Sequence, residues 1–170
     1  ETLRRAATVC SIAALQSEYS LWTRDVESDV LATCAELGVA FVPYSPLGRG
    51  FLTGQLTPAD ISRPGDLRPA IPRFSEANFA KNSDWLSPLR EVAEEAGATM
   101  AQVALAWVLS RNPFIYPIPG ARRAEHLRAN FAASGLILPA HELAQLTSHF
   151  VLHAAAGARL PPQLLSAVNV

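Results

Sequence analysis

One stretch decides the fold: Val39-Ala40-Phe41-Val42-Pro43-Tyr44, followed directly by Ser45-Pro46-Leu47-Gly48-Arg49-Gly50. The first half is an unbroken apolar run, which is typical of a strand buried on both faces in a parallel sheet. The second half is rich in glycine and proline, which predicts a loop at the carboxyl end of that strand. Because α/β proteins build their sites at strand carboxyl ends, this junction is the first candidate for a functional site.

Strand-like and helical patterns alternate upstream of this stretch. Between Thr8 and Ser20, the apolar run from Val9 to Leu15 predicts a buried strand. Asp25 is a candidate N-cap for the helix that follows, and Gly38 is a candidate residue for its C-terminal end.

Downstream, the regular pattern is lost from Ser45 to about Asn82, and we interpret this stretch as one long loop. Helical periodicity then returns and ends at Gly97. The start of that helix is ambiguous, because it lies either near Trp85 or at Ser87-Pro88, which also has the pattern of a cap and first helical position.

The rest of the chain continues the alternation. Thr99-Met100-Ala101-Gln102 is a capping box that predicts a helix to about Ser110. Phe114–Ile118 is strand-like, and helices are expected over Arg123–Ser134 and Ala140–Phe150, before a mixed tail over 151–170. The order predicts an α/β protein with about three parallel strands, which cannot close a barrel and would leave both sheet edges open.

Composition limits the classes of function. The chain has 170 residues, of which 49% are hydrophobic, so it is long and apolar enough to form a core. Its net charge is −1 and its pI is about 6.5, which disfavours nucleic acid or an anionic membrane as the main partner. No apolar run reaches the roughly 18 residues needed to span a bilayer.

Two cysteines, Cys10 and Cys34, are too few for a disulfide framework or a zinc site. We interpret both as reduced, buried thiols, and we expect no bound metal. The sequence begins at Glu1 without an initiator Met or a signal-peptide pattern, so we expect a cytoplasmic protein that has been processed, cropped or truncated. Lys81 is the single lysine, so a mechanism that needs a lysine must use it or import one.

Three segments at or just beyond the predicted strand ends hold the candidate site residues. They are Gln16–Trp22, Tyr44–Gly54 and Ile118–Arg123, the last followed by His126 and Asn130. Taken singly, the second and third segments are about as well explained by a structural or solvated turn as by a binding site, and Gln16 and Tyr44 are each better explained as packing residues.

The second and third segments have features of a phosphate site. Gly48 and Gly50 allow close approach of the backbone. Ser45 and Arg49 are able to donate hydrogen bonds to phosphate. The pair Arg122-Arg123 stands at a predicted helix N-terminus, which also favours phosphate. Neither segment is a Walker or Rossmann fingerprint.

Together these segments resemble the C-terminal part of the aldo/keto reductase family. The matching stretches, in family order, are Ala14–Trp22, Tyr44–Gly54, Pro72–Phe74, Ala101–Leu109 and Pro117–Arg123, with Asn130. The resemblance implies a partial (β/α)8 TIM barrel in which residues 1–170 supply about the last three βα units, strands six to eight. It also implies an oxidoreductase that transfers hydride between NADPH and a small-molecule aldehyde or ketone.

The resemblance implies a role in NADP(H) binding for twelve residues. Gln16 would hydrogen-bond the nicotinamide carboxamide, and Tyr44 would stack on the nicotinamide ring. The residues bordering the pyrophosphate would be Ser45, Leu47, Gly48 and Arg49, with Pro46 among them. The residues at the adenosine end would be Gly120, Ala121 and Arg122 around the 2′-phosphate, His126 nearby, and Asn130 at the adenine.

The same resemblance shows what is missing. The family's proton-relay set of an Asp, a Tyr, a Lys and a His has no match here, because Lys81 lies in a polar loop and every histidine lies at or after His126. No catalytic residue is therefore assigned, and we expect this chain alone not to catalyse the reaction. Two further departures are Gly120-Ala121, where many relatives have Lys-Ser, and Ala129, where Glu is common.

Three interpretations stay open. The chain is part of an NADPH-dependent reductase, or a truncated non-catalytic relative that binds nucleotide or pairs with a partner, or a decayed or cropped reading frame. We expect self-association through open sheet edges, since the core side chains Leu15, Phe41, Val42 and Ile115 would lack half their neighbours. The substrate is not identified, and the Gln55–Lys81 loop and Trp22 are either pocket walls or surface cover.

Overall fold

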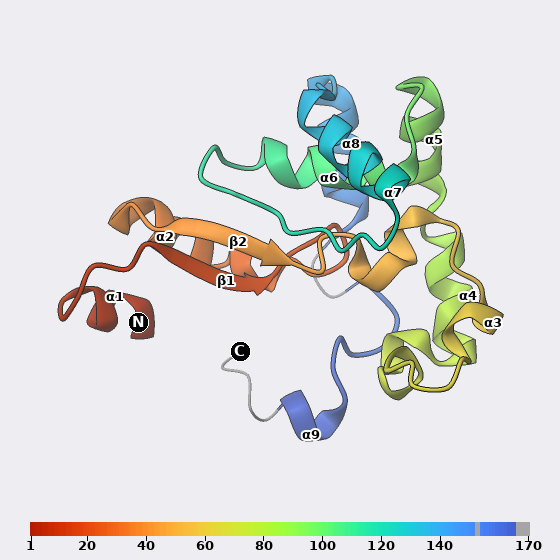
Figure 1. Cartoon of the computed structure of the whole chain (residues 1–170), viewed down its shortest axis with the longest axis horizontal. Helices are drawn as coiled ribbons and strands as arrows, with labels where there is room; N and C mark the ends of the chain where they lie inside the picture. Colours follow the sequence, from red (N-terminus) through yellow and green to blue (C-terminus); the bar gives the residue numbers. More distant parts are fainter. Residues whose placement is uncertain (152–153, 166–170) are drawn as a thin grey trace.

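The computed structural model describes residues 1–151 and 154–165 (Figure 1). Within these residues, two strands, β1 (Ala14–Glu18) and β2 (Ala40–Tyr44), pair in parallel, with Ala14 opposite Ala40 and Glu18 opposite Tyr44. Helices pack around this small sheet, so the chain is an α/β structure, as predicted. The run Val39–Tyr44 is confirmed as a strand.

The first strand lies later than predicted. Residues Thr2–Ala7 form helix α1, and the expected strand residue Val9 is 85% exposed in the turn that follows. The side chain of Arg4 binds Glu36 at 2.7 Å and so attaches α1 to the next helix. The strand instead includes Glu18, whose charge is compensated by residues far away in the sequence, a contact that no local pattern contains.

The crossover between the strands also differs from the prediction in part. Asp25 begins a short 3₁₀ turn, η1 (Asp25–Glu27), and the helix itself is α2 (Val30–Leu37), which starts after Asp29. Gly38 ends α2 with a φ of 66°, a left-handed conformation that glycine adopts without strain. The predicted C-terminal residue of this helix is confirmed.

The third expected strand, Phe114–Ile118, is not a continuous strand. It lies along the other side of β2, which it meets at bridges between Phe41 and Ile115 and between Tyr44 and Ile118. The backbone of β2 therefore bonds β1 on one side and this segment on the other. On the side of this segment, the Phe41 N–H donates to the Phe114 carbonyl at 2.9 Å. Pro43 of β2 has no N–H to donate to the Tyr116 carbonyl, which interrupts the ladder, whereas the Tyr116 and Ile118 N–H groups still donate to the Phe41 and Pro43 carbonyls.

We predicted one long loop for this stretch, but residues 45–84 form a series of short helical elements. They are the 3₁₀ turns η2 (Gly48–Thr53), η3 (Arg68–Ala70) and η4 (Pro72–Phe74) and the helices α3 (Pro58–Ile61) and α4 (Glu76–Asp84). Phe51, Ile61 and Phe74 anchor this segment in the core. Their spacing follows neither a helical nor a strand period, because the segment changes direction between anchors.

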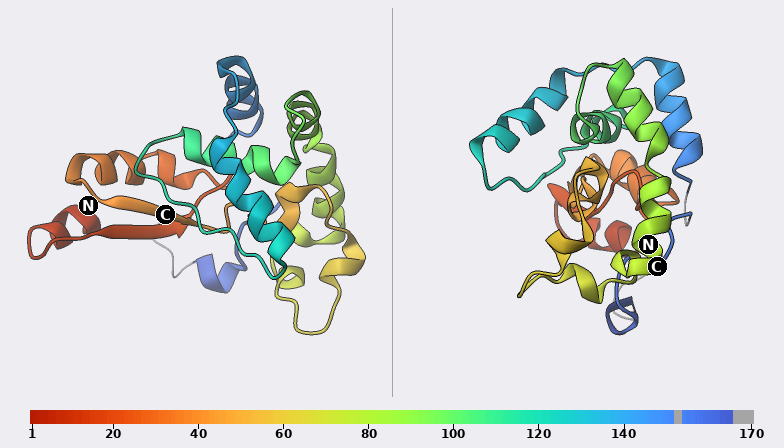
Figure 2. Two further views of the ribbon diagram at one scale, coloured as in Figure 1. Left: turned by 45° about the horizontal axis from the view of Figure 1, so that its top comes forward. Right: turned by 90° about the vertical axis from the view of Figure 1, so that its right-hand side faces the viewer.

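The remaining helices form a layer on one side of the sheet, visible at the top of Figure 1. They are α5 (Ser87–Glu95), α6 (Met100–Ser110), α7 (Ala124–Ala132) with the 3₁₀ turn η5 (Ala133–Gly135), and α8 (Ala140–His149). The capping box is confirmed, since Thr99 and Gln102 bond each other's backbone N–H groups. The helix α5 starts at Ser87, which favours the later of the two predicted starts, but its N-cap is Leu86 and not Ser87. A short helix, α9 (Pro162–Leu165), follows on another side, as the views in Figure 2 show.

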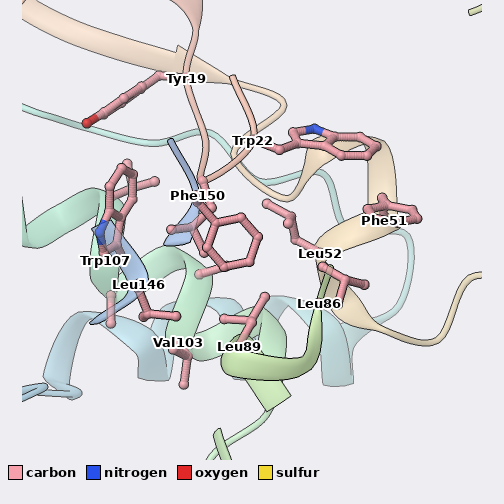
Figure 3. Packing of buried hydrophobic residues seen from close by; sticks show 14 of the residues in the cluster. Tyr19, Trp22, Phe51, Leu52, Leu86, Leu89, Val103, Trp107, Leu146 and Phe150 are labelled. Atoms are coloured by element: carbon pink, nitrogen blue, oxygen red, sulfur yellow. The ribbon is translucent and has the colours of Figure 1, made fainter. Parts of the chain in front are cut away.

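The core lies between the sheet, the η2 segment and the helical layer (Figure 3). Trp22 is buried there and stacks on Phe51 with ring centroids 4.3 Å apart, so it is neither pocket wall nor surface cover. Of the four residues expected to lack neighbours, Phe41 and Ile115 are buried, contrary to that expectation, whereas Leu15 and Val42 are only partly buried. Burying a large apolar side chain stabilises the fold by about 1.5–3 kcal/mol.

Two global features bear on function. Over residues 1–151 and 154–165, no helix has the length and apolarity needed to cross a membrane. The same residues bring together no group of three or more His, Cys, Asp or Glu side chains able to hold a metal ion. Cys34 is buried as predicted, but Cys10 is exposed in the turn after α1, so that half of the cysteine prediction is wrong.

Candidate functional site

A pocket of about 690 Å³ opens beside the carboxyl end of β2. Its walls come from the segment after β2, from Arg68, from the start of α6, and from residues 118–130. The pocket brings together eight of the twelve residues predicted from the sequence: Ser45, Pro46, Leu47, Arg49, Gly120, Arg122, His126 and Asn130. Two candidate segments far apart in the sequence therefore form one concave surface.

The four other predicted residues lie around this pocket rather than in its wall. Ala121 lines an adjoining cavity of about 900 Å³, together with Arg122 and His126. Gly48 is buried at the start of η2. Gln16 is exposed on β1, and Tyr44 is half-buried at the end of β2.

The pocket also contains residues that the sequence interpretation did not assign. These are Gly50, Thr53, Gln55, Leu56, Arg68, Thr99, Ala101, Ile118, Pro119 and Ala129. Gln55, Leu56 and Arg68 belong to the 55–81 segment, which the sequence indicated as a pocket wall or surface cover. Thr99 and Ala101 had no functional signal, because a capping box indicates only where a helix begins.

The loop after β2 is a tight turn with an unusual backbone. Gly48, Arg49 and Gly50 have φ values of 56°, 57° and 94°, all in the left-handed region. The Gly50 N–H donates to the Leu47 carbonyl at 3.0 Å and holds the turn closed. A Cβ at Gly48 would lie 2.5 Å from Trp22 Nε1, so only glycine fits there.

Basic side chains gather at the pocket. Arg49, Arg68, Arg122 and His126 line it, and the described lining residues include no Asp or Glu. Apolar side chains, among them Leu47 and Ile118, form other parts of the same wall. This combination suits a ligand that carries phosphate groups next to flat apolar rings.

The two arginines at the start of α7 differ in their contacts. Arg123 Nε lies 3.0 Å from Glu125 Oε1, and Arg123 Nη2 lies 2.8 Å from His126 Nε2. Arg122 lines both cavities, and within the described parts of the chain the structure shows no ion pair or side-chain hydrogen bond for it. Arg122 is therefore the guanidinium more available to an anion.

The Arg49 side chain is bound to a carboxylate, whereas the sequence predicted that it donates to phosphate. Its Nη1 and Nη2 atoms donate to the Glu18 carboxylate at 2.9 and 3.1 Å, and the Glu18 side chain is fully buried. Arg68 donates to the carbonyl of Arg49 at 3.1 Å and also pairs with Asp66. Hydrogen bonds from Arg68 lower the pKa of Asp66, so this carboxylate stays ionised.

The tyrosines and Lys81 occupy separate surroundings. Tyr19 is buried and donates to Glu27 at 2.6 Å; burial, together with that bond, raises its pKa well above the ordinary value. Tyr116 is 59% exposed, and Lys81 is exposed on α4.

Residues 1–150 match the sequence profile described as the aldo/keto reductase family. The chain belongs to the aldo/keto reductase family. Among its relatives, an aldo-keto reductase of Strobilurus tenacellus is 44% identical over 147 residues, which cover 85% of this chain and 44% of the relative. A probable aldo-keto reductase of Glycine max is 38% identical over 159 residues, covering 94% of this chain and 46% of the relative.

Solved structures of aldo/keto reductases show the same likeness. A thermostable aldo-keto reductase in complex with the inhibitor epalrestat is 33% identical with a TM-score of 0.62, covering 86% of this chain and 44% of that one. A glycerol dehydrogenase from Gluconobacter oxydans is 25% identical with a TM-score of 0.79, covering 92% and 47%. This aldo/keto reductase chain thus spans less than half the length of each of these relatives.

Proposed function

We propose that this chain forms the cofactor-binding, C-terminal part of an NADP(H)-dependent aldo/keto reductase, which reduces a carbonyl compound by hydride transfer. The observation that carries the proposal is the pocket lined by basic side chains, which collects eight of the residues expected to bind the cofactor.

The residues present fit a dinucleotide. The backbone of the Ser45–Gly50 turn borders the pocket and offers a close approach for the pyrophosphate. Arg122, which lines both cavities beside Gly120, would bind the 2′-phosphate, and Asn130 would meet the adenine. Gln16 and Tyr44, beyond the pocket wall, would hold the nicotinamide end, which supplies the hydride when the cofactor is bound.

We propose in addition that residues 1–170 supply about the last three units of a (β/α)8 barrel. In this arrangement β1, β2 and the Phe114–Ile118 segment are strands six to eight. Their parallel order, with β2 in the middle, and the coverage of less than half of each relative support this assignment.

No residue of this chain is assigned to proton transfer. Tyr19 is occupied by Glu27, and Lys81 lies outside the pocket wall. The proton donor is expected from the rest of the barrel, so we expect the isolated chain to bind NADPH without turning over an aldehyde.

A second candidate function is that of a nucleotide-binding or interaction module without catalysis. It is favoured by the apolar surface of α7, where Leu127 and Phe131 are 62% and 79% exposed. Both functions share the nucleotide pocket and differ in whether a partner half completes a catalytic site.

The test is a calorimetric titration of the chain with NADPH. Ala129→Trp places a large ring in the pocket wall and should weaken binding at least tenfold. Ala132→Trp, on the same helix but outside the lining residues, is the matched control and should bind as the wild type does. Absence of NADPH binding at millimolar concentration by the folded wild-type chain would contradict the proposed function.

A further inference from the structure

We infer that Glu18 is a positioning residue, which holds Arg49 in a left-handed conformation and so shapes the pocket wall formed by Leu47, Arg49 and Gly50. The inference rests on the proposed function for the identity of the ligand, but its structural part stands on contacts of the chain itself. It assigns to Arg49 an action through its backbone instead of direct contact with phosphate.

Glu18 is a fully buried carboxylate at the end of β1. Both of its oxygens accept hydrogen bonds from Arg49, and Thr23 Oγ1 lies 3.3 Å from Oε1. A buried carboxylate is tolerated only when a cation and hydrogen bonds compensate it. The position of the Arg49 side chain is therefore strongly specified by Glu18.

The backbone of Arg49 needs such a constraint. Its φ of 57° and ψ of 31° lie in a region that residues with a Cβ rarely adopt, because the Cβ approaches the carbonyl oxygen. Its neighbours Gly48 and Gly50 share the left-handed region without that penalty. The ion pair to Glu18 and the bond from Arg68 to the Arg49 carbonyl hold the residue there from both sides.

This conformation sets the wall of the pocket. The turn directs the N–H groups of Gly50 and Leu52 to the Leu47 carbonyl, at 3.0 and 3.2 Å. Both Nη atoms of Arg49 donate to Glu18, so these two donors are engaged by the carboxylate. Loss of Glu18 would release the strained turn and deform the surface that a pyrophosphate would contact.

Glu18 also links the pocket wall to the C-terminal segment. Arg159 Nη1 lies 3.7 Å from Glu18 Oε2, and Arg73 joins the Thr23 hydroxyl at 2.7 Å to the Gly157 carbonyl at 3.3 Å. Three guanidiniums therefore gather around one buried carboxylate and hold residues 157–159 against the end of β1. Changes at Glu18 should loosen this segment together with the pocket turn.

The experiment compares glycine and alanine at position 49 in a chain without the carboxylate. Glu18→Gln should weaken NADPH binding at least tenfold. Adding Arg49→Gly should restore binding to within about threefold of wild type, because glycine adopts the left-handed turn without help. Adding Arg49→Ala should not restore it. At an ordinary helical position such as Arg90, alanine stabilises the fold more than glycine does. A larger rescue by glycine than by alanine at position 49 therefore identifies an effect of the backbone conformation.

A second readout needs no nucleotide. Amide hydrogen exchange of Gly50 and Leu52 in the free chain should accelerate at least tenfold in Glu18→Gln and return toward the wild-type rate in Glu18→Gln/Arg49→Gly. Glu36→Gln, which breaks the exposed ion pair with Arg4, is the matched control and should leave both rates unchanged.

Each outcome decides the inference. If Arg49 contacts phosphate directly, the glycine and alanine variants at position 49 should lose NADPH binding equally. If Glu18 has a purely structural role, glycine at position 49 should not rescue binding. Either result overturns the inference. If Glu18→Gln is unfolded, Arg49→Gly must restore folding, and failure to do so also overturns it. If the wild type binds no NADPH, the proposed function fails, and the exchange rates still decide whether Glu18 positions the turn.

Discussion

The guanidinium of Arg24 donates to the backbone carbonyl of Phe150 at 2.7 Å, across 126 residues of sequence. The same Nη1 atom donates to the Thr147 carbonyl at 2.7 Å, so Arg24 caps the C-terminal end of α8. Arg24 also binds Glu27 and lies 5.3 Å from the centre of the Trp107 ring. The turn after β1 is thereby attached to the last helix of the layer above the sheet.

Replacement of Arg24 should destabilise the whole fold. Arg24→Ala leaves the Thr147 and Phe150 carbonyls without their donor and Glu27 without its cation, and we expect a loss of about 2–4 kcal/mol in the free energy of unfolding. Arg24→Lys should recover less than half of this, because one ammonium cannot reproduce the planar fork. Urea denaturation measures the effect, and Arg90→Ala, at an exposed site on α5, should change stability by less than about 0.5 kcal/mol.

Acid should weaken the same attachment through Glu27. Burial acts to raise the pKa of Glu27, but the hydrogen bonds from Arg24 and Tyr19 outweigh burial and lower it below its ordinary value. A carboxyl with a lowered folded-state pKa contributes stability above its unfolded-state pKa and loses it as the pH falls through the folded-state pKa. Thermal unfolding from pH 7 down to about pH 3 should therefore show a smaller loss for Glu27→Gln than for wild type. Parallel curves for the two proteins would contradict this role.

Cofactor preference should depend on Arg122. A charge-assisted hydrogen bond contributes roughly 1.5–3 kcal/mol, which is about ten- to a hundredfold in affinity. Arg122→Ala should weaken NADPH at least tenfold and leave NADH nearly unchanged, since NADH has no 2′-phosphate. Arg123→Ala should have a small effect, because Arg123 is paired with Glu125. Equal weakening of both cofactors, or an effect confined to Arg123→Ala, would exclude the assignment.

The apolar surface of α7 should cause self-association of the isolated chain. No residue of α7 is buried, and Leu127 and Phe131, four positions apart, share a face of the helix. Phe131→Gln should shift the chain toward monomer in sedimentation experiments at micromolar concentration. Val9→Gln removes an exposed apolar side chain elsewhere and serves as the comparison. A wild-type chain that is a clean monomer with one sharp thermal transition would refute the prediction.

The two cysteines should differ in reactivity. Cys10 is exposed, whereas Cys34 is buried and its burial raises the pKa of its thiol. Because the thiolate is the reactive form, an aromatic disulfide reagent should modify one thiol per native chain and two in denaturant. Cys10→Ser should abolish the native reaction, and any fast reaction left in that variant would contradict the burial of Cys34.

Elements that depend on neighbouring residues could be predicted from local patterns in the sequence. The apolar run before Tyr44 predicted β2, the Thr99–Gln102 capping box predicted the start of α6, and Gly38 predicted the end of α2. These signals are local, because a strand run, a cap and a left-handed glycine each act within a few residues. The family resemblance also indicated the residues that meet in the pocket, although their closeness became visible only in three dimensions.

Features that depend on partners far apart in the sequence appear only in the folded chain. Glu18 is stable in a buried strand because Arg49, 31 residues later, neutralises it, and Arg68 enters the pocket wall by bonding the carbonyl of that same residue. The Phe114–Ile118 segment shares only part of a ladder with β2, since Pro43 has no N–H to donate to it. Sequence patterns describe one segment at a time, whereas charge compensation, burial and pairing are energies between segments, and these appear only when the chain is folded.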